Sequence, residues 1–517
     1  MKNKDHSKLS KKIESFDTFS EILSYRANVS PEKIFLIEGD KVLTYKKFNN
    51  LVDSCCFYFK KNGIIPGNVI SVVLRNSVDY LIIYFAAIRS RLIINPFPYH
   101  TSANEVIQKA RDVKPEIIFC HNNHFKSLLK SKYKIINLDK IGDESFSIYL
   151  EGFKNKSHPI LPIIDNQVAV YYYSSGTTGG PKIIEYTHKS MVLGQASMVR
   201  AGFSKLNSVH LCVLPLGHTA SLRYTVKQCI CTGSMIVLYE SFWKLRSNLW
   251  SEVDKHKATF MEIVPSILIA ILNTPYKDFN KKQVNSISFI GCGSAFLPKN
   301  LQDSFEKKFG IKVANLYGLS ETGATHFDDP SQDSWKAGSI GKPFDIVECK
   351  IFTESGKEVK DGNDGEIGIK GPGLFKGYLN NTKLYNNCFH KGFFMTGDIG
   401  RKDKQGNYYY TDRKKDLIIK GGINIVPSHI EGVLQSYPFI KEAAVIGVPD
   451  MLLGETIKCF LIPKNGIKID ADKIRNYCKE KLGDFKTPSE IEIVETLPKG
   501  PSGKILKKDL RLFSTKV

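Results

Sequence analysis

The sequence predicts an α/β protein that has a large N-terminal part and a small C-terminal α+β domain. Two observations carry this prediction. Strand-like and helix-like apolar segments alternate through the first 330 residues, as in residues 69–75 followed by 77–88, a pattern typical of layered sheets covered by helices. The chain of 517 residues is also too long to fold around one ordinary core.

The segments differ in character along the chain. Residues 1–15 are polar and show no apolar periodicity, so we expect a disordered arm. Two α/β series follow, over about 16–165 and 166–330. Residues 337–412 contain Asp-Gly and Gly-Pro turns that predict a small antiparallel β-barrel or sheet. The remainder forms a compact α+β series joined near residue 415, which divides the chain into domains 16–414 and 415–517.

Composition excludes several functions. The net charge of +21 comes from lysines spread along the whole chain, with no basic stripe that would predict nucleic-acid binding. No apolar run reaches a membrane-spanning length, and the first residues lack the core of a signal peptide. The 11 scattered cysteines show no zinc spacing and indicate buried thiols in a reducing compartment. We therefore expect a cytoplasmic protein.

The strongest motif is the glycine-rich segment 171–182, in which six small residues precede Gly180, Pro181 and Lys182. Small residues let backbone N–H groups form a nest for phosphate oxygens, and hydroxyl groups add donors. Because Pro181 precedes the lysine and Ile183 follows it, the segment is not a Walker loop. The flanking apolar runs predict a loop between two strands. The six small residues are Ser174, Ser175, Gly176, Thr177, Thr178 and Gly179.

This loop resembles the signature of the adenylate-forming superfamily, which includes acyl-CoA synthetases, aryl-acid ligases, firefly luciferase and peptide-synthetase adenylation domains. Four further motifs follow in the same order, so the resemblance spans about residues 16–511. It implies an N-terminal part made of two α/β subdomains and a β-barrel, with a mobile C-terminal lid. It also implies ATP and Mg²⁺ as cofactors, and a thiol acceptor that is coenzyme A or a carrier protein's phosphopantetheine.

The resemblance assigns nucleotide contacts to residues of three motifs. In segment 315–323, Tyr317 stacks on adenine, Ser320 hydrogen-bonds the α-phosphate and Glu321 holds Mg²⁺. Asp398 binds the ribose hydroxyls, and Arg413 reaches the ribose or phosphates. The resemblance adds Gly293, Ser294 and Gly318 to the nucleotide site, and Thr177 to the metal site.

The remaining assignments concern catalysis and domain movement. By the same resemblance, Lys504 bridges the acid's carboxylate and the α-phosphate, and His218 lies near both. Lys415 is the hinge of the lid. Gly421 and Gly422 form the strip along which the thiol arm passes.

The acid itself is less well defined. We expect Gly217, Val264, Gly291 and Cys292 to line the acyl pocket. No carboxylate occurs in segment 217–224, which disfavours an α-amino acid and favours a fatty or aryl acid. Arg223 is either a solvated helix residue or the partner of a second carboxylate. The alternatives to a coenzyme A ligase are a stand-alone enzyme that loads a separate carrier protein and a non-catalytic nucleotide-binding relative.

Overall fold

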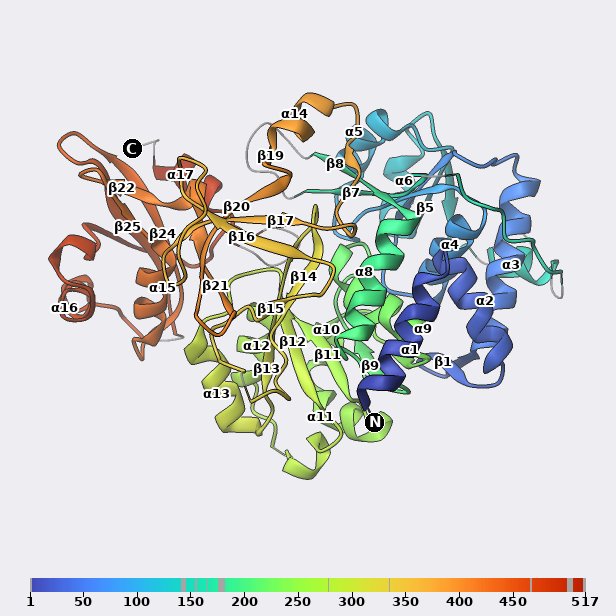
Figure 1. The fold of residues 1–517 in the computed structure, drawn as a ribbon, viewed down its shortest axis with the longest axis horizontal. Coiled ribbons are helices and arrows are strands. Elements are labelled where there is room, and N and C mark those ends of the chain that lie inside the picture. Colours follow the sequence, from blue (N-terminus) through green and yellow to red (C-terminus); the bar gives the residue numbers. More distant parts are fainter. Residues whose placement is uncertain are drawn as a thin grey trace.

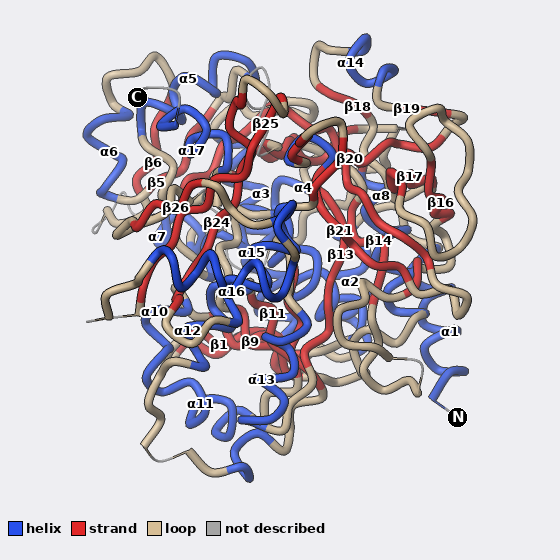
Figure 2. Tube along the Cα trace, turned by 90° about the vertical axis from the view of Figure 1, so that its left-hand side faces the viewer, coloured by secondary structure: helices blue, strands red, loops and turns tan. Residues whose placement is uncertain are grey.

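The computed structural model describes residues 2–140, 146–153, 156–164, 166–174, 182–277, 279–333, 335–464, 467–499 and 505–514. Four sheets organise these residues. In Figure 1, the sheet built from the last hundred residues lies at one end of the molecule, and the helices of the first hundred residues lie at the other. Figure 2 views the C-terminal sheet and its helices from their outer side.

The largest sheet has nine strands, and its central strands are parallel. Antiparallel strands are confined to its two edges. In spatial order the strands are β15 (Lys342–Pro343), β14 (Gly323–Phe327), β13 (Val313–Leu319), β12 (Phe289–Gly293), β11 (Phe260–Ile263), β9 (Val209–Cys212), β10 (Met235–Leu238), β1 (Ile34–Glu38) and β2 (Lys41–Thr44).

The second sheet has seven strands and joins early and middle parts of the chain. Its order is β18 (Gly377–Tyr378), β8 (Ile183–Thr187), β7 (Val168–Tyr173), β4 (Ile93–Pro96), β3 (Val69–Val73), β5 (Ile117–Cys120) and β6 (Lys134–Asn137). The pairing of β7 with β8 is antiparallel. This confirms that the glycine-rich segment joins two strands.

The helices cover and separate the two large sheets. The main core cluster combines α2, α3, α4, α8 and α9, and every residue of α4 except Asp79 is buried. The described α-helices are α1 (Lys2–Glu14), α2 (Phe19–Val29), α3 (Tyr45–Lys61), α4 (Val78–Arg89), α5 (Ala103–Val113), α6 (Asn122–Leu128), α7 (Phe146–Glu151), α8 (His188–Arg200), α9 (Gln228–Thr232), α10 (Phe242–Leu245), α11 (Leu249–His256), α12 (Pro265–Leu272), α13 (Lys299–Phe309), α14 (Thr382–Asn387), α15 (Pro427–Ser436), α16 (Ala471–Leu482) and α17 (Lys507–Ser514). The π-helix η1 (Ser221–Lys227) precedes α9.

The third sheet is antiparallel and contains β16 (Glu348–Phe352), β17 (Gly365–Lys370), β20 (Phe393–Lys402), β19 (Phe389–His390) and β21 (Tyr408–Arg413). These ladders agree with the small antiparallel barrel or sheet that the turns of residues 337–412 predict. The fourth sheet contains β23 (Ile423–Ile425), β22 (Ile418–Lys420), β25 (Gly454–Pro463), β24 (Ile440–Asp450) and β26 (Glu490–Ile493).

The expectation of a disordered arm at residues 1–15 is wrong. Residues 2–14 form α1, which packs on α8. Ile13 is fully buried, Ser10 donates a hydrogen bond of 2.8 Å to the carbonyl oxygen of Ala196, and Glu14 pairs with Arg200. The helix is held by these tertiary contacts, because its own sequence has too few apolar residues to show a periodic pattern.

Two further expectations concern the chain's environment. All 11 cysteines are free, and nine of them are buried, which confirms that they serve as small apolar side chains. In the described parts of the chain, no helix is both long enough and apolar enough to cross a membrane.

Candidate functional site

The ends of the glycine-rich loop are fixed by the β7–β8 hairpin. The N–H of Ser174 donates to the carbonyl oxygen of Lys182 at 2.9 Å, and the N–H of Lys182 donates to Ser174 Oγ at 3.3 Å. Lys182 Nζ lies 5.2 Å from the ring centre of Tyr378. The loop residues Ser175, Gly176, Thr177, Thr178 and Gly179 lie outside the described residues. The structure therefore places a cation at the loop's rim.

Three residues predicted to contact the nucleotide come together from three strands. Asp398 on β20 and Arg413 on β21 are opposite residues of an antiparallel ladder, and Arg413 Nε lies 2.6 Å from Asp398 Oδ1. The hydroxyl of Tyr317, at the end of β13, donates to Asp398 Oδ2 at 2.7 Å. Tyr317 and Arg413 are far apart in the sequence, and the fold brings both to the carboxylate of Asp398.

Burial and charge set the state of this cluster. Asp398 is 1% exposed. Although burial lowers the pKa of Arg413, the carboxylate of Asp398 raises that pKa further, so the pair is ionised. Burial, and then Asp398, raises the pKa of the Tyr317 phenol well above its ordinary value, so the phenol stays protonated and donates a hydrogen bond to the carboxylate. An ionised carboxylate held in this way can also accept hydrogen bonds from a cis-diol.

Glu321 lies in the turn between β13 and β14. Gly318 has no room for a Cβ, because the carbonyl oxygen of Gly323 occupies that space. The turn is closed by the N–H of Leu319, which donates to Thr322 Oγ1 at 2.9 Å. Ser320 is half-buried in the same turn. The sequence therefore folds into a tight hairpin that presents Ser320 and Glu321 together.

Burial and neighbouring polar groups have opposite effects on the carboxyl group of Glu321. Burial raises its pKa, while Tyr378, Arg413 and Lys182 oppose the rise. The Tyr378 hydroxyl donates to Glu321 Oε1 at 3.2 Å. Among the residues that the structure describes, no group of three or more His, Cys, Asp or Glu could hold a metal ion. A single carboxylate suits Mg²⁺, which is usually held by one or two carboxylates together with substrate phosphates.

His218 is neutral and oriented by the backbone. Burial, and then the charge of Arg223, lowers its pKa to about 4. Its Nδ1 accepts from the N–H of Ala220 at 3.4 Å, which assigns the proton to Nε2. Nε2 is therefore a hydrogen-bond donor for an anionic oxygen.

Gly293 ends β12 and Ser294 follows it, on the opposite side of β13 from the Glu321 turn. A Cβ at Gly293 would lie 2.6 Å from the carbonyl oxygen of Leu316, so glycine is required there. Ser294 has a φ of +65° and is exposed. This strained backbone at the end of a parallel strand is typical of a binding site.

The residues predicted to act in domain movement lie around β22. Lys415 is part of the short helix η4 (Lys414–Asp416). Gly421 and Gly422 have φ values of +56° and +77°, as a tight hairpin turn between β22 and β23 requires. The turn explains both glycines, so their role in thiol passage stays a prediction. Lys504 lies outside the described residues.

The residues predicted to line the acyl pocket are closely packed. A Cβ at Gly291 would lie 2.6 Å from Leu316 Cδ1 and 3.1 Å from Phe260 Cε2. The neighbouring side chains therefore already fill the space that the glycine leaves. Val264 and Cys292 belong to a core cluster. Gly217 packs against the backbone of Phe97. Their assignment to the acyl pocket stays a prediction.

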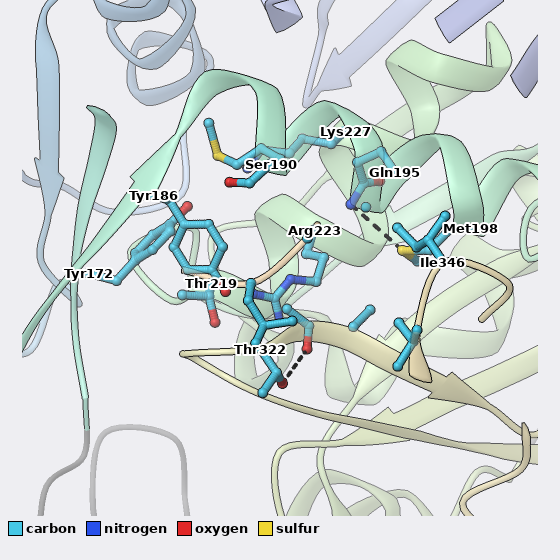
Figure 3. Close-up of a pocket in the computed structure, with 17 residues that line it drawn as sticks. Tyr172, Tyr186, Ser190, Gln195, Met198, Thr219, Arg223, Lys227, Thr322 and Ile346 are labelled. Carbon is cyan, nitrogen blue, oxygen red and sulfur yellow. Dashed lines mark hydrogen bonds between the residues drawn. The ribbon is translucent and has the colours of Figure 1, made fainter. Parts of the chain in front are cut away.

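Arg223 is not a solvated helix residue. It is half-buried and lines a pocket between α8, η1, β14 and the segment around Gly373 (Figure 3). Its side chain points between Thr219 and Thr322. Thr219 follows His218 in the sequence and Thr322 follows Glu321, so two residues that line the pocket are chain neighbours of predicted catalytic residues.

Tyr378 is the contact that the sequence did not reveal. It touches both Glu321 and Lys182, and it belongs to β18, which pairs with β8 beside the glycine-rich loop. A two-residue strand leaves no periodic signal. Only the Gly-Tyr pair after a glycine-rich turn region marks the position.

Comparison with known proteins gives the class. The model of the AMP-binding enzyme family matches residues 23–379, and the model of the AMP-binding enzyme C-terminal domain matches residues 429–504. The chain belongs to the AMP-binding enzyme family. It is an AMP-forming acid–thiol ligase of the acyl-CoA synthetase type. Enzymes of this type use ATP, Mg²⁺ and coenzyme A.

Two relatives and one solved structure illustrate the range of similarity. A sulfoacetate–CoA ligase of Cupriavidus necator is 28% identical over 96% of this chain and 98% of that relative. A long-chain-fatty-acid–CoA ligase of Bacillus subtilis is 30% identical, covering 95% and 94%. The ATP-bound structure of MatB from Rhodopseudomonas palustris superposes with a TM-score of 0.89 at 24% identity, covering 96% and 99%. This last similarity shows the fold.

Proposed function

We propose that this enzyme activates a carboxylic acid other than an α-amino acid and transfers the acyl group to the thiol of coenzyme A. The observation that best supports this is the Tyr317–Asp398–Arg413 cluster, because it presents an ionised carboxylate and an aromatic ring where a ribose and its purine would bind. Glu321 lies in the turn that follows Tyr317 and would hold Mg²⁺ beside the phosphates.

In the first half-reaction, an oxygen of the substrate carboxylate attacks the α-phosphorus of ATP and pyrophosphate leaves. His218 would donate from Nε2 to an anionic oxygen, and Ser320 would hydrogen-bond the α-phosphate. Lys182 and Lys504 would offset the negative charge that develops in the transition state. Mg²⁺ would supply electrostatic stabilisation to the phosphates.

In the second half-reaction, the thiol attacks the carbonyl carbon of the acyl-adenylate and AMP leaves. We propose that the domain after Lys415 turns about this residue, which withdraws Lys504 and presents the Gly421–Gly422 turn. Lys415 lies between two ion pairs: Lys414 pairs with Glu366 at 2.8 Å within the N-terminal part, and Arg511 pairs with Asp416 at 3.1 Å within the C-terminal domain. Neither pair joins the two domains, so the chain can turn at Lys415 without breaking either of them.

The acid and the acceptor are the finer parts of this proposal. The two relatives named above act on sulfoacetate and on long-chain fatty acids, so they do not restrict the acid to the fatty or aryl class. We propose coenzyme A as the acceptor, with a separate carrier protein as the alternative. A reducing compartment such as the cytoplasm suits the 11 free cysteines.

Acid-dependent exchange of pyrophosphate into ATP tests the first half-reaction. A panel of fatty, aryl, dicarboxylic and α-amino acids should give exchange with at least one acid outside the amino-acid group. Each active acid is then offered with coenzyme A or with a phosphopantetheinylated carrier protein. Thioester on the carrier alone would replace the proposed acceptor. An absence of exchange with every acid would favour the non-catalytic alternative.

A further inference from the structure

The pocket of Figure 3 carries positive charge without a carboxylate in its described lining. Arg223 and Lys227 both line it, and none of its described lining residues is Asp or Glu. The neighbouring side chains shown in Figure 3 include the polar or aromatic Tyr186, Gln195 and Thr322 together with the apolar Met198 and Ile346. A buried cation normally has a paired anion.

The partners of the two cations are neutral. Lys227 is 4% exposed, and its Nζ lies 3.1 Å from the sulfur of Met191. Burial, and then Arg223, lowers the pKa of Lys227 to about 7. Burial raises the pKa of the Tyr224 phenol, and the charge of the neighbouring Arg223 opposes the rise. Within the described part of the chain, neither cation forms an ion pair.

Two carboxyl groups lie near the pocket without lining it. Burial raises the pKa of Glu262 to about 8, although Arg223 opposes the rise, and Glu262 Oε2 has no hydrogen-bond partner among the described residues. Glu321 lies in the adjoining turn, where Mg²⁺ would neutralise it. Neither group supplies a fixed counter-charge to Arg223.

The packing is tight at Gly291, whereas the pocket beside Arg223 contains open space. Over Gly291, the side chains of Leu316 and Phe260 fill the surface, and Phe260 packs in an aromatic cluster with Phe203 and Phe289. Thr219 and Thr322, which directly follow His218 and Glu321 in the sequence, line the pocket. A substrate whose carboxylate is activated there can extend its other end toward Arg223.

We infer that the substrate acid carries a second anionic group, a carboxylate or sulfonate, which Arg223 binds with its planar guanidinium and Lys227 supports by charge. This inference rests on the proposed function. Because a guanidinium binds two oxygens of such a group at once, the site favours diacids over monoacids of the same length.

Matched acids test the inference on the full-length enzyme. ATP–pyrophosphate exchange is measured with succinate against butanoate, adipate against hexanoate, and 3-sulfopropanoate against propanoate. In at least one pair, we expect kcat/KM to be at least about tenfold higher for the diacid than for the monoacid. This is the scale of one charged hydrogen-bonded contact. Monoacids that exceed diacids throughout would overturn the inference and leave the proposed function intact. No exchange with any acid would overturn both.

Variants assign the effect to Arg223. Arg223→Met should lower kcat/KM for the diacid by about 100-fold and for the monoacid by less than threefold, whereas Arg223→Lys should retain part of the preference. Arg475→Met on the exposed face of α16 is the matched control and should change neither. Equal losses for both acids, with a native unfolding temperature, would contradict the inference. If Arg223→Met does not fold, the wild-type pairs and Arg223→Lys decide it.

A competition experiment distinguishes binding of the second anion as part of a substrate from binding as a regulator. An anion that bound the pocket as an effector would alter exchange supported by hexanoate without being activated itself. We expect added succinate to compete with hexanoate and to be converted to its thioester when coenzyme A is present. Modulation without conversion would overturn the substrate assignment.

Discussion

Asp398 and Arg413 face each other across the β20–β21 ladder, and the guanidinium Nε lies 2.6 Å from the carboxylate. The relationship is built into the sheet register, which sets the two residues opposite each other. Tyr317 contacts the second oxygen of the same carboxylate. The nucleotide site that we propose is therefore preorganised, and its parts can be separated by substitution.

Asp398→Asn should raise the KM for ATP by roughly 10- to 100-fold, because a charged hydrogen-bond acceptor contributes about 1.5–3 kcal/mol. Wild-type enzyme should discriminate strongly between ATP and 3′-deoxy-ATP, and the variant should lose most of that discrimination. Pyrophosphate exchange with both nucleotides measures it. Tyr317→Phe keeps the ring and should retain the discrimination. If Asp398→Asn discriminates as well as wild type, Asp398 does not bind the ribose.

Glu321→Gln should raise the Mg²⁺ concentration needed for half-maximal exchange by about tenfold, because it removes an anionic metal ligand. Burial raises the pKa of Glu321, so the proton competes with Mg²⁺ at a higher pH than for an ordinary glutamate. The Mg²⁺ requirement of the wild type should therefore rise as pH falls, and rise less in the variant. Protonation of ATP itself also weakens Mg²⁺ binding as pH falls, but it does so equally with both enzymes and cancels in the comparison. Glu348→Gln, at an exposed strand end, is the control. An unchanged Mg²⁺ titration in Glu321→Gln would contradict the assigned role.

A buried histidine should make the fold sensitive to acid. His210 is fully buried, and burial lowers its pKa to about 3. The neutral form is favoured in the folded state, so its contribution to stability is present above pH 6.5 and is lost as pH falls toward 3. By pH 5 the loss is about 2 kcal/mol. Urea unfolding of His210→Gln should show a decline between pH 7 and pH 5 that is smaller by about this amount. Ser204→Ala, which removes the 2.9 Å hydroxyl partner, should keep the steep decline, and equal declines in all three proteins would refute the role of His210.

The sequence predicted the parts of the site that depend on short contiguous motifs. Tyr317 with Glu321 and Asp398 with Gly397 each lie in a local segment whose glycines and strand pattern determine the turn, and the strands around the glycine-rich loop followed from its apolar flanks. What the sequence did not contain was their mutual placement. The register of the β20–β21 ladder sets Asp398 opposite Arg413. The alternation of residues along each strand does not by itself specify which residues of the two strands pair.

Elsewhere tertiary contacts overrode the local pattern. Arg223 reaches the pocket from a π-helix, whose wider turn changes which residues share a face, so a period of 3.6 residues misplaces it. Lys507 pairs with Glu431 at 2.8 Å and joins α17 to α15. Neither partner is distinguishable by sequence from the many charged residues on surface helices. Such pairs form because distant elements pack, and they leave no periodic signal.

Lys504→Ala should reduce adenylate formation by at least about 1000-fold while preserving thioester formation from supplied acyl-AMP and coenzyme A. The reason is that the proposed domain movement withdraws this lysine before the second half-reaction. Pyrophosphate exchange and thioester release measure the two steps separately. Lys499→Ala removes a nearby lysine that pairs with Glu442 at 2.6 Å and serves as the control. Similar losses in both half-reactions would contradict this division.

The central claim is that the acid becomes an acyl-adenylate, and the path of a carboxylate oxygen tests it most directly. In that mechanism one oxygen of the acid forms the bond to the α-phosphorus and stays with AMP when the thiol displaces it. Turnover of an active acid labelled with ¹⁸O in its carboxylate, with ATP and coenzyme A, should therefore yield AMP that carries one ¹⁸O atom for each thioester formed, as read by mass spectrometry. Unlabelled AMP, or label recovered in inorganic phosphate together with ADP, would contradict the account.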